Sequence, residues 1–452
     1  MTFPAYPAYK NSGVQWIGSI PEHWCASRLR NIFFIQKRIA GKLGFDVLSI
    51  TNKGVKIKDV DSGDGQLSSD YSKYQLVMKG EFAMNHMDLV TGYVDISEFD
   101  GVTSPDYRVF SSAHPELDNP RFMLRLLQNA YHQKLFFPFG QGSAHLGRWR
   151  LPTEEFKDFF FPRPSRFEQT QIARFLDHET ARIDALIEEQ QRLIELLKEK
   201  RQAVISRAVT KGLDPTVQMK DSGVKWLGEV PAHWEITQIK RRCNLITDGA
   251  HISPETESGV YCFVSTRDVS DEGIDFDGCL RTSAASYEYL VKTGCQPAIG
   301  DVLFSKDGTI GRTIVVGENS PDFVVASSLI IIRPNRAELL PIYLDFMCQS
   351  WVVSQQVDGF VKGAGLPRLS IQNLTKVVGV FPPLEEQALI AHFLQLQCVA
   401  ARQLSSEAWR TMELLKERRS ALISAAVTGK IDVRAWLPPA NVPTPKLVQE
   451  AV

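Results

Sequence analysis

Two long stretches of the chain carry apolar residues at alternating spacings of three and four, which is the pattern of an amphipathic helix. The first covers residues 166–209 and contains no Gly or Pro. Seven of ten regularly spaced positions in it are apolar, as in a coiled-coil seam with polar interruptions: Ile172, Leu176, Glu179, Ile183, Leu186, Gln190, Leu193, Leu197, Lys200 and Val204. The seam of the second stretch is Ile390, Leu394, Gln397, Ala401, Leu404, Ala408, Thr411, Leu415, Arg418 and Leu422. The pattern predicts two long helices.

Residues that favour helix ends flank each predicted helix on both sides. Pro164 and the Pro382-Pro383 pair precede the starts, and Gly212 and Gly429 stand where helices stop. A helix of about 42 residues is about 63 Å long, which is too long for one small domain to bury. We therefore expect the two to pack on each other as an antiparallel, pseudo-two-fold pair. The alternative is two separate helices, each covering its own domain.

The chain also repeats itself. NSGVQWIGSIPEHW at residues 11–24 matches DSGVKWLGEVPAHW at 221–234. LLKEKRQAVISRAVT at 196–210 matches LLKERRSALISAAVT at 414–428, and EQ-x-x-IA-x-FL occurs at both 168 and 386. The segments between these landmarks differ, so each half is a similar frame around a dissimilar insert. His23, His233 and the frame tryptophans are interpreted as parts of this frame.

The sequences of the inserts predict mixed α/β domains. Apolar runs at 313–316 and 323–332 predict strands, and residues 121–135 and 341–353 predict short helices. The predicted fold is α+β, with two α/β domains joined by the helix pair. Its parts are a first domain at 11–163, a helix at 164–212, a second domain at 213–381, a helix at 382–430 and a flexible tail at 431–452.

Composition narrows the class of protein. The 452 residues include 51 Lys and Arg against 52 Asp and Glu, a net charge of -1, which excludes a polybasic binder but still permits a basic cleft. No apolar run is long enough to span a bilayer, and the start of the sequence lacks a signal-peptide layout. The seven cysteines include no C-x-x-C, which argues against a disulfide framework or zinc ribbon. We expect a cytoplasmic protein with reduced thiols.

Signature motifs of several enzyme classes are absent from the sequence. There is no phosphate-binding P-loop, no G-x-G-x-x-G after a strand, no amino-methyltransferase tetrad and no convincing nuclease signature. These absences favour a binding protein over an enzyme.

Three Gly-rich basic loops are candidates for contact with DNA, because such loops let backbone approach phosphate while Arg, Lys, Gln and Ser reach base edges. They lie at 140–150, 305–312 and 362–368, and the first and third occupy equivalent places in the two halves. The alternative for each is an ordinary solvated turn. The candidate DNA-binding residues are Gln141, Ser143, His145, Arg148, Arg150, Lys306, Arg312, Lys362 and Arg368.

Taken together, the W-[IL]-G-x-[IV]-P-x-H-W segments, the EQ-x-x-IA-x-FL segments and the LLKE-[KR]-R helices resemble the specificity subunit of type I restriction-modification systems. The resemblance covers residues 11–432. It implies that each insert is a target recognition domain for one half of a bipartite, asymmetric DNA site, and that the helices set the spacing between the half-sites. The first copy departs from the pattern at Phe167, where the second has a carboxylate, and this could alter one partner contact.

The resemblance also implies partners. Members of the family contain no active site or cofactor and recruit two modification subunits, which carry S-adenosylmethionine and methylate adenine. Restriction subunits add ATP- and Mg²⁺-dependent translocation and cleavage. The competing hypotheses are a scaffold that binds only proteins and a stand-alone methyltransferase with an unrecognised site.

Overall fold

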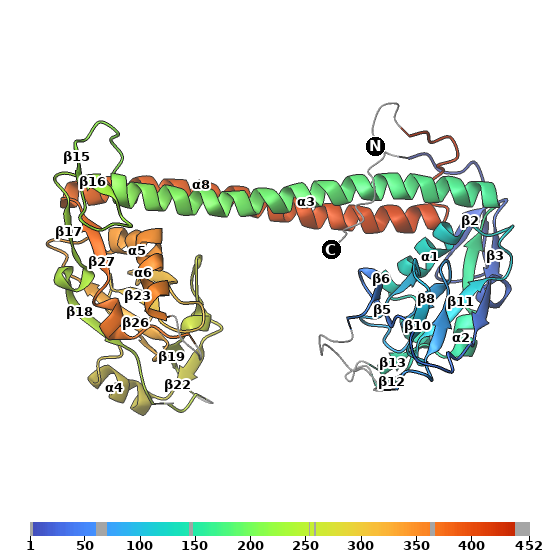
Figure 1. Ribbon diagram of the computed structural model, residues 1–452, viewed down its shortest axis with the longest axis horizontal. Coiled ribbons are helices and arrows are strands. Elements are labelled where there is room, and N and C mark those ends of the chain that lie inside the picture. Colours follow the sequence, from blue (N-terminus) through green and yellow to red (C-terminus); the bar gives the residue numbers. More distant parts are fainter. Residues whose placement is uncertain are drawn as a thin grey trace. The chain divides into compact units, whose positions relative to one another are not determined.

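The computed structural model describes residues 3–59, 70–143, 148–252, 254–256, 259–361 and 367–438. The chain divides into two compact units. Unit 1 is made of Met1–Gln190 and Arg410–Val452, and unit 2 is Gln191–Trp409. The chain leaves unit 1 within helix α3 (Arg166–Lys211) and returns to it within helix α8 (Leu384–Val427) (Figure 1).

The two predicted long helices are confirmed. α3 has 46 residues and α8 has 44. Gly212 and Gly429 follow them with φ of 74° and 73°, the left-handed conformation that ends many helices and that glycine adopts at little cost. A Cβ on Gly429 would lie 2.5 Å from Pro21, so close packing against the frame requires glycine there as well.

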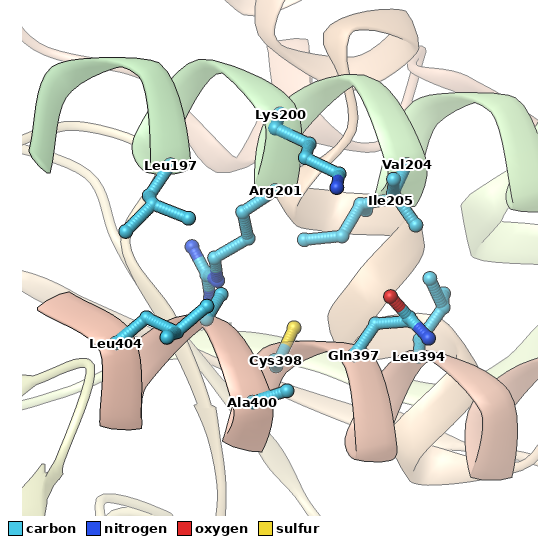
Figure 2. Close-up of a pocket in the computed structure, with 11 residues that line it drawn as sticks. Leu197, Lys200, Arg201, Val204, Ile205, Leu394, Gln397, Cys398, Ala400 and Leu404 are labelled. Carbon is cyan, nitrogen blue, oxygen red and sulfur yellow. The ribbon is translucent and has the colours of Figure 1, made fainter. Parts of the chain in front are cut away.

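Within each unit the first half of one helix packs on the second half of the other, so the pair is antiparallel. In unit 1, Arg419 of α8 pairs with Asp184 of α3 at 2.8 Å. In unit 2, Leu197 of α3 and Cys398 of α8 line a cavity of about 100 Å³ between the helices, and Figure 2 shows Cys398 pointing toward α3.

The predicted seam is only partly correct. Ile172, Leu176 and Ile183 are buried, but Leu186, Leu193 and Lys200 face solvent. The less exposed positions there are Ile187, Ile194 and Arg201, one residue further along. The second helix shows the same slip, with Cys398 and Met412 buried and Gln397, Leu404, Thr411 and Arg418 exposed. An unsupercoiled helix has 3.6 residues per turn, so its buried stripe drifts away from a strict seven-residue repeat.

Unit 1 is built on a four-stranded antiparallel sheet, in the order β4 (Phe33–Gln36), β11 (Arg108–Ser112), β8 (Phe82–Met84) and β9 (Val94–Ile96). Helix α1 (Pro120–His132) lies between this sheet and the helices (Figure 1). It buries Leu126 and Ala130 in one core with Phe82, Ile172 and Ala426. The remaining elements are β1 (Tyr9–Asn11) paired with β2 (Ser19–Pro21), β3 (Cys25–Arg28) with β14 (Phe160–Arg163), β5 (Leu48–Thr51) with β6 (Gly54–Ile57), β7 (Gln75–Val77) with β10 (Gly101–Thr103), β12 (Gln141–Ser143) with β13 (Arg148–Arg150), and helix α2 (Thr153–Asp158).

Unit 2 has an equivalent sheet, in the order β18 (Cys243–Asp248), β26 (Leu329–Pro334), β23 (Val302–Ser305) and β24 (Thr313–Val315). Helices α5 (Pro341–Gln349) and α6 (Trp351–Val361) join its core, which also contains Ile205 of α3 and Ile390 of α8. The remaining elements are β15 (Met219–Asp221) paired with β16 (Glu229–Pro231), β17 (Glu235–Gln238) with β27 (Val378–Phe381), β20 (Val269–Ser270) with β21 (Gly273–Ile274), β19 (Tyr261–Val264) between β22 (Leu280–Thr282) and β25 (Phe323–Val325), α4 (Ala284–Lys292) and α7 (Ile371–Leu374). The apolar run predicted as one strand at 323–332 is therefore two strands in different sheets.

The repeated frame makes the same contact in both units. His23 Nε2 lies 2.9 Å from a carboxylate oxygen of Glu168 in α3, and His233 Nε2 lies 2.7 Å from one of Glu386 in α8. Trp234 also donates to Glu386, at 2.9 Å. These bonds dock the P-x-H-W segment on the first turn of each long helix, as the interpretation of His23 and His233 as frame residues requires.

Both ends of the described chain pack on the start of α3. Phe3 and Trp436 each make an edge-on ring contact with Phe175, and the Asp432 N–H donates to the Pro4 carbonyl at 2.7 Å. Val433 is buried in the unit 1 core. The first residues of the predicted tail, 431–436, are thus part of the fold, and 439–452 lie outside the described residues.

Candidate nucleic-acid interface

The two four-stranded sheets have equivalent strand orders, and β8 and β23 pair with their neighbours in the same register. Met84 of β8 pairs with Val94 and Arg108, and Phe304 of β23 pairs with Thr313 and Ile330. Two residues after Met84 and Phe304, the His86 carbonyl accepts from the Leu151 N–H at 2.9 Å and the Lys306 carbonyl accepts from the Leu369 N–H at 2.8 Å. This register makes His86 the counterpart of Lys306, Met87 that of Asp307, and Arg150 that of Arg368.

In unit 1 the candidate loop is the hairpin β12–β13. Gln141 is the ladder partner of Arg150, and both side chains are exposed. Trp149 anchors the hairpin, because its indole N–H donates to the Phe137 carbonyl at 2.8 Å. A Cβ on Gly140 would lie 2.3 Å from that indole nitrogen. Gly140 is thus required by close packing at the base of the hairpin.

A second loop supports the hairpin from the other side. This loop follows β8 and is joined to the chain around β13 by two hydrogen bonds. The Leu89 N–H donates to the Trp149 carbonyl, and the Leu151 N–H donates to the His86 carbonyl, both at 2.9 Å. Arg108 of β11 is buried below it and donates to the Leu151 carbonyl at 3.1 Å. Arg150 therefore stands on a fixed backbone, and among the described residues no carboxylate forms an ion pair with it.

The environment of His86 is unusual. Burial and the nearby guanidinium groups of Arg108 and Arg150 lower the pKa of His86 to about 3. Burial also lowers the pKa of Arg108 to about 10. His86 Nδ1 and Arg108 Nη1 are buried without a hydrogen-bond partner among the described residues. His86 is consequently neutral at pH 7, and the positive charge at this edge of the sheet comes from the two arginines.

In unit 2 a closed loop connects β23 to β24. Ser305 N–H donates to the Arg312 carbonyl at 2.8 Å, and Gly311 N–H donates to the Ser305 carbonyl at 3.0 Å. Gly308 and Gly311 have φ of 65° and 89°. Arg312 turns back onto the protein, donating from Nη1 to the Val269 carbonyl at 2.7 Å.

Lys306 points into the protein and is 4% exposed. Its ammonium bonds to the carboxylate of Asp248, which also bonds to His251 at 2.9 Å. Burial opposes ionisation of Asp248, but the hydrogen bonds from Lys306 and His251 hold the pKa of its carboxyl below the ordinary value. Lys306 is thus neutralised and supports the loop, and His251 is the exposed member of the group.

Asp307 and Arg368 lie side by side at the surface of unit 2. They are antiparallel bridge partners, and Asp307 Oδ2 is 3.7 Å from Arg368 Nε. The predicted loops 305–312 and 362–368 are therefore in contact through Asp307 and Arg368.

The predicted site residues have different situations. Gln141, Arg150 and Arg368 are exposed at the two equivalent loops, Arg312 is half-buried and Lys306 is buried. Ser143 and Arg148 are ladder partners in the hairpin, and His145 and Lys362 lie outside the described residues. Sequence reasoning missed His86 and Asp248 as neighbours of these loops, and it did not count Asp307, inside the loop 305–312, among the candidate residues. The available signal was the shared Gly-acid pair before each strand, Gly80-Glu81 and Gly300-Asp301, which fixes the register of the loops that follow.

Two searches over the described residues bear on other kinds of site. No group of three or more His, Cys, Asp or Glu side chains among them could hold a metal ion. None of their helices is both long and apolar enough to cross a membrane. The seven cysteines are free thiols.

Residues 231–396 match the family model of the type I restriction modification DNA specificity domain. Two curated relatives carry the names of specificity subunits of type I restriction enzymes. A sequence assigned as the MjaX subunit of Methanocaldococcus jannaschii is 26% identical over 174 residues, 37% of this chain and 40% of that protein. The EcoBI subunit of Escherichia coli is 22% identical over 295 residues, 62% of this chain and 60% of that protein. The matches thus span less than two thirds of either relative.

A solved structure has the same fold. It is a chain from work on complex assembly and conformational transition of the type I R-M system, and it superposes with a TM-score of 0.67 at 15% identity, covering 91% of this chain and 99% of that one. The family match, the two relatives and this fold confirm the resemblance to type I specificity subunits that the duplicated segments indicated.

Proposed function

We propose that this chain, which resembles the specificity subunits of type I restriction-modification systems, reads DNA for such a system and has no active site of its own. Each unit reads one half of a bipartite, asymmetric site. The observation that carries the proposal is that the two sheets match in register. This match places Arg150 and Arg368 on equivalent loops, although the residues around the two arginines differ. An exposed arginine on an ordered loop can contact phosphate or a guanine edge.

The half-sites differ because the two reading surfaces differ. Unit 1 offers Gln141 and Arg150 with no ion-pair partner for Arg150 among the described residues. Unit 2 offers Arg368 beside the carboxylate of Asp307, with His251 close to the same loop. Two unlike surfaces on one duplicated frame favour an asymmetric sequence over a palindrome.

The long helices dock the modification subunits in this proposal and set the spacing between half-sites. In unit 2, α8 presents Leu389, Phe393 and Leu396 on one face, with Leu389 64% and Leu396 57% exposed. No Asp, Glu, Lys or Arg occurs between residues 387 and 401. An exposed, uncharged face of this kind is typical of a protein-protein contact. The corresponding face in unit 1 carries Phe175, which Phe3 and Trp436 cover.

The partners supply the chemistry. Two modification subunits bring S-adenosylmethionine and methylate one adenine in each half-site, and restriction subunits bring ATP- and Mg²⁺-dependent cleavage. Because a methylated adenine must leave the helical stack, the reading loops have to tolerate that distortion of the duplex.

The test is to map methylated adenines across the genome of cells that carry the chain and its modification subunit. We expect a split motif with one methylated adenine in each half, absent without the chain. The double variant Arg150→Gln, Arg368→Gln should weaken both halves, while Glu318→Gln, an exposed carboxylate beyond the other end of β24, should leave the motif unchanged. If the partners are expressed and no chain-dependent motif exists, the proposal is wrong.

A further inference from the structure

An acidic side chain stands within a surface that is proposed to bind DNA. Asp307 follows β23 directly after Lys306, and its side chain is 34% exposed. Among the described residues, no donor makes a hydrogen bond to its carboxylate, and its contact with Arg368, at 3.7 Å, is longer than a hydrogen bond. Both groups therefore keep free hydrogen-bonding capacity toward a ligand.

Asp307 is held in place. The bonds between Ser305, Gly311 and Arg312 close its loop, and the Leu369 N–H to Lys306 carbonyl bond joins that loop to the segment of Arg368. Lys306 cannot neutralise Asp307, because its ammonium is committed to Asp248. The unit thus presents a fixed acceptor and a fixed donor side by side.

A carboxylate repels phosphate, so this pair does not suit a contact with the DNA backbone. It suits a base edge in the major groove. There the exocyclic amino groups of cytosine and adenine are donors that a carboxylate accepts, and N7 or O6 acceptors beside them are reached by arginine. Adenine displays both an acceptor and an amino donor on one edge.

We propose that Asp307 and Arg368 form one base-reading pair, with Asp307 requiring an amino-bearing base, adenine or cytosine, at one position of the half-site that unit 2 reads. Arg368 donates to an acceptor on the same or the adjacent base. The inference rests on the proposed DNA function and adds a specificity-determining residue to it.

Unit 1 supplies an internal comparison. The register match gives Met87 at the position of Asp307 and Arg150 at that of Arg368. A thioether accepts hydrogen bonds only weakly. The half-site read by unit 1 therefore carries no amino requirement at the corresponding place, and the two halves of the motif differ there.

The test uses the full chain assembled with its modification subunits, and duplexes in which one half-site at a time is randomised. The readouts are the selected sequences and the methylated motif. For the wild type we expect one position in one half-site that accepts only adenine or cytosine. Asp307→Ala should lower that discrimination by about tenfold or more, the worth of one direct base contact, and leave every other position unchanged.

Asp307→Asn is the second variant, because it keeps the size of the side chain and offers both a donor and an acceptor. It should shift the same position toward adenine, because a carboxamide can accept from the N6 amino group and donate to N7. Glu318→Gln, which also removes one exposed carboxylate from unit 2, should leave the motif intact. Neither Asp307 variant should reduce the steepness of the salt dependence, since neither removes a phosphate contact.

The outcomes are separable. A split motif that is identical in the wild type and both Asp307 variants overturns the base-reading pair and leaves the proposed function standing. A loss of binding that is uniform across all positions also overturns it, because a lost base contact acts at one position. If the wild-type assembly selects no split motif, the proposed function itself fails and this inference falls with it.

Discussion

Protonation of His86 should weaken the sheet of unit 1 as the pH falls. The folded pKa of His86 is about 3, lowered by burial and by Arg108 and Arg150, against 6.5 for an ordinary histidine. Between these two pKa values the unfolded chain binds a proton at His86 and the folded chain does not. The contribution of neutral His86 to the free energy of unfolding is therefore present above pH 6.5 and is lost as the pH falls below that value.

The magnitude follows from the two pKa values. Between pH 7.5 and pH 5.5 this histidine alone should remove about 1.4 kcal/mol from the free energy of unfolding of unit 1, and at pH 5 the loss reaches about 2 kcal/mol. His86→Gln cannot take up a proton and should lose this component. His251→Gln is the matched control, because His251 is exposed in unit 2 and should leave the pH dependence of unit 1 as it is in the wild type.

Native-state hydrogen exchange of the backbone amides in β8 and β11 measures the quantity directly, because these strands lie at the centre of the sheet. The exchange free energy of the wild type should fall by about 1.4 kcal/mol more than that of His86→Gln over this pH range. Equal falls in the two proteins would show that His86 ionises normally in the folded state and would refute the reasoning from its burial.

Three further predictions concern the reading loops and the helices. Gly140→Ala would bring a Cβ within 2.3 Å of the Trp149 indole nitrogen, so it should destabilise the hairpin by about 1–3 kcal/mol in thermal unfolding and weaken binding to the half-site of unit 1; an unchanged melting curve would contradict the packing argument. Arg150→Gln should lower the slope of log affinity against log salt by about 0.9 if Arg150 neutralises one phosphate, measured by titration of labelled duplex between 50 and 200 mM salt, and a slope equal to that of the wild type would assign Arg150 to another role. Leu389→Glu with Leu396→Glu should release one of the two modification subunits, seen as a lower mass in sedimentation velocity, and an assembly of unchanged mass would exclude this face as a docking surface.

The long helices could be predicted closely from the sequence, whereas the contacts between them could not. Pro164, and the absence of Gly and Pro from residues 166–209, predicted a start of the first helix at residue 166, as observed. The seam slips by one residue at Leu186 in α3 and at Gln397 in α8. A seven-residue rule does not record how far each helix supercoils, and that depends on its partner along the whole length.

The candidate loops illustrate a second limit. The Gly-rich sequences at 140–150, 305–312 and 362–368 remain predictions of DNA contact, whereas the equivalence of the first and third follows from their Arg-Leu endings. The inward direction of Lys306 could not be foreseen, because its partner Asp248 lies on a strand 58 residues away in the sequence. Side-chain direction at the end of a strand is decided by such long-range pairs, which one sequence does not display.

The packing of both chain ends on α3 makes unit 1 discontinuous in sequence, with the whole of unit 2 inserted into it. Ile423, Ala426 and Val433 belong to the same core as Ile20 and Phe82, so the amino-terminal part has to wait for residues 410–438 before its core can close. At about 5–20 residues per second, the ribosome needs roughly ten to forty seconds to make the intervening segment. During that interval unit 2 can complete its fold while the apolar surface of unit 1 stays open to chaperones and proteases. A chain that ends early would then contain a folded unit 2 and an unfolded unit 1, and the exposed apolar surface of unit 1 would make such an incomplete chain a target for proteases.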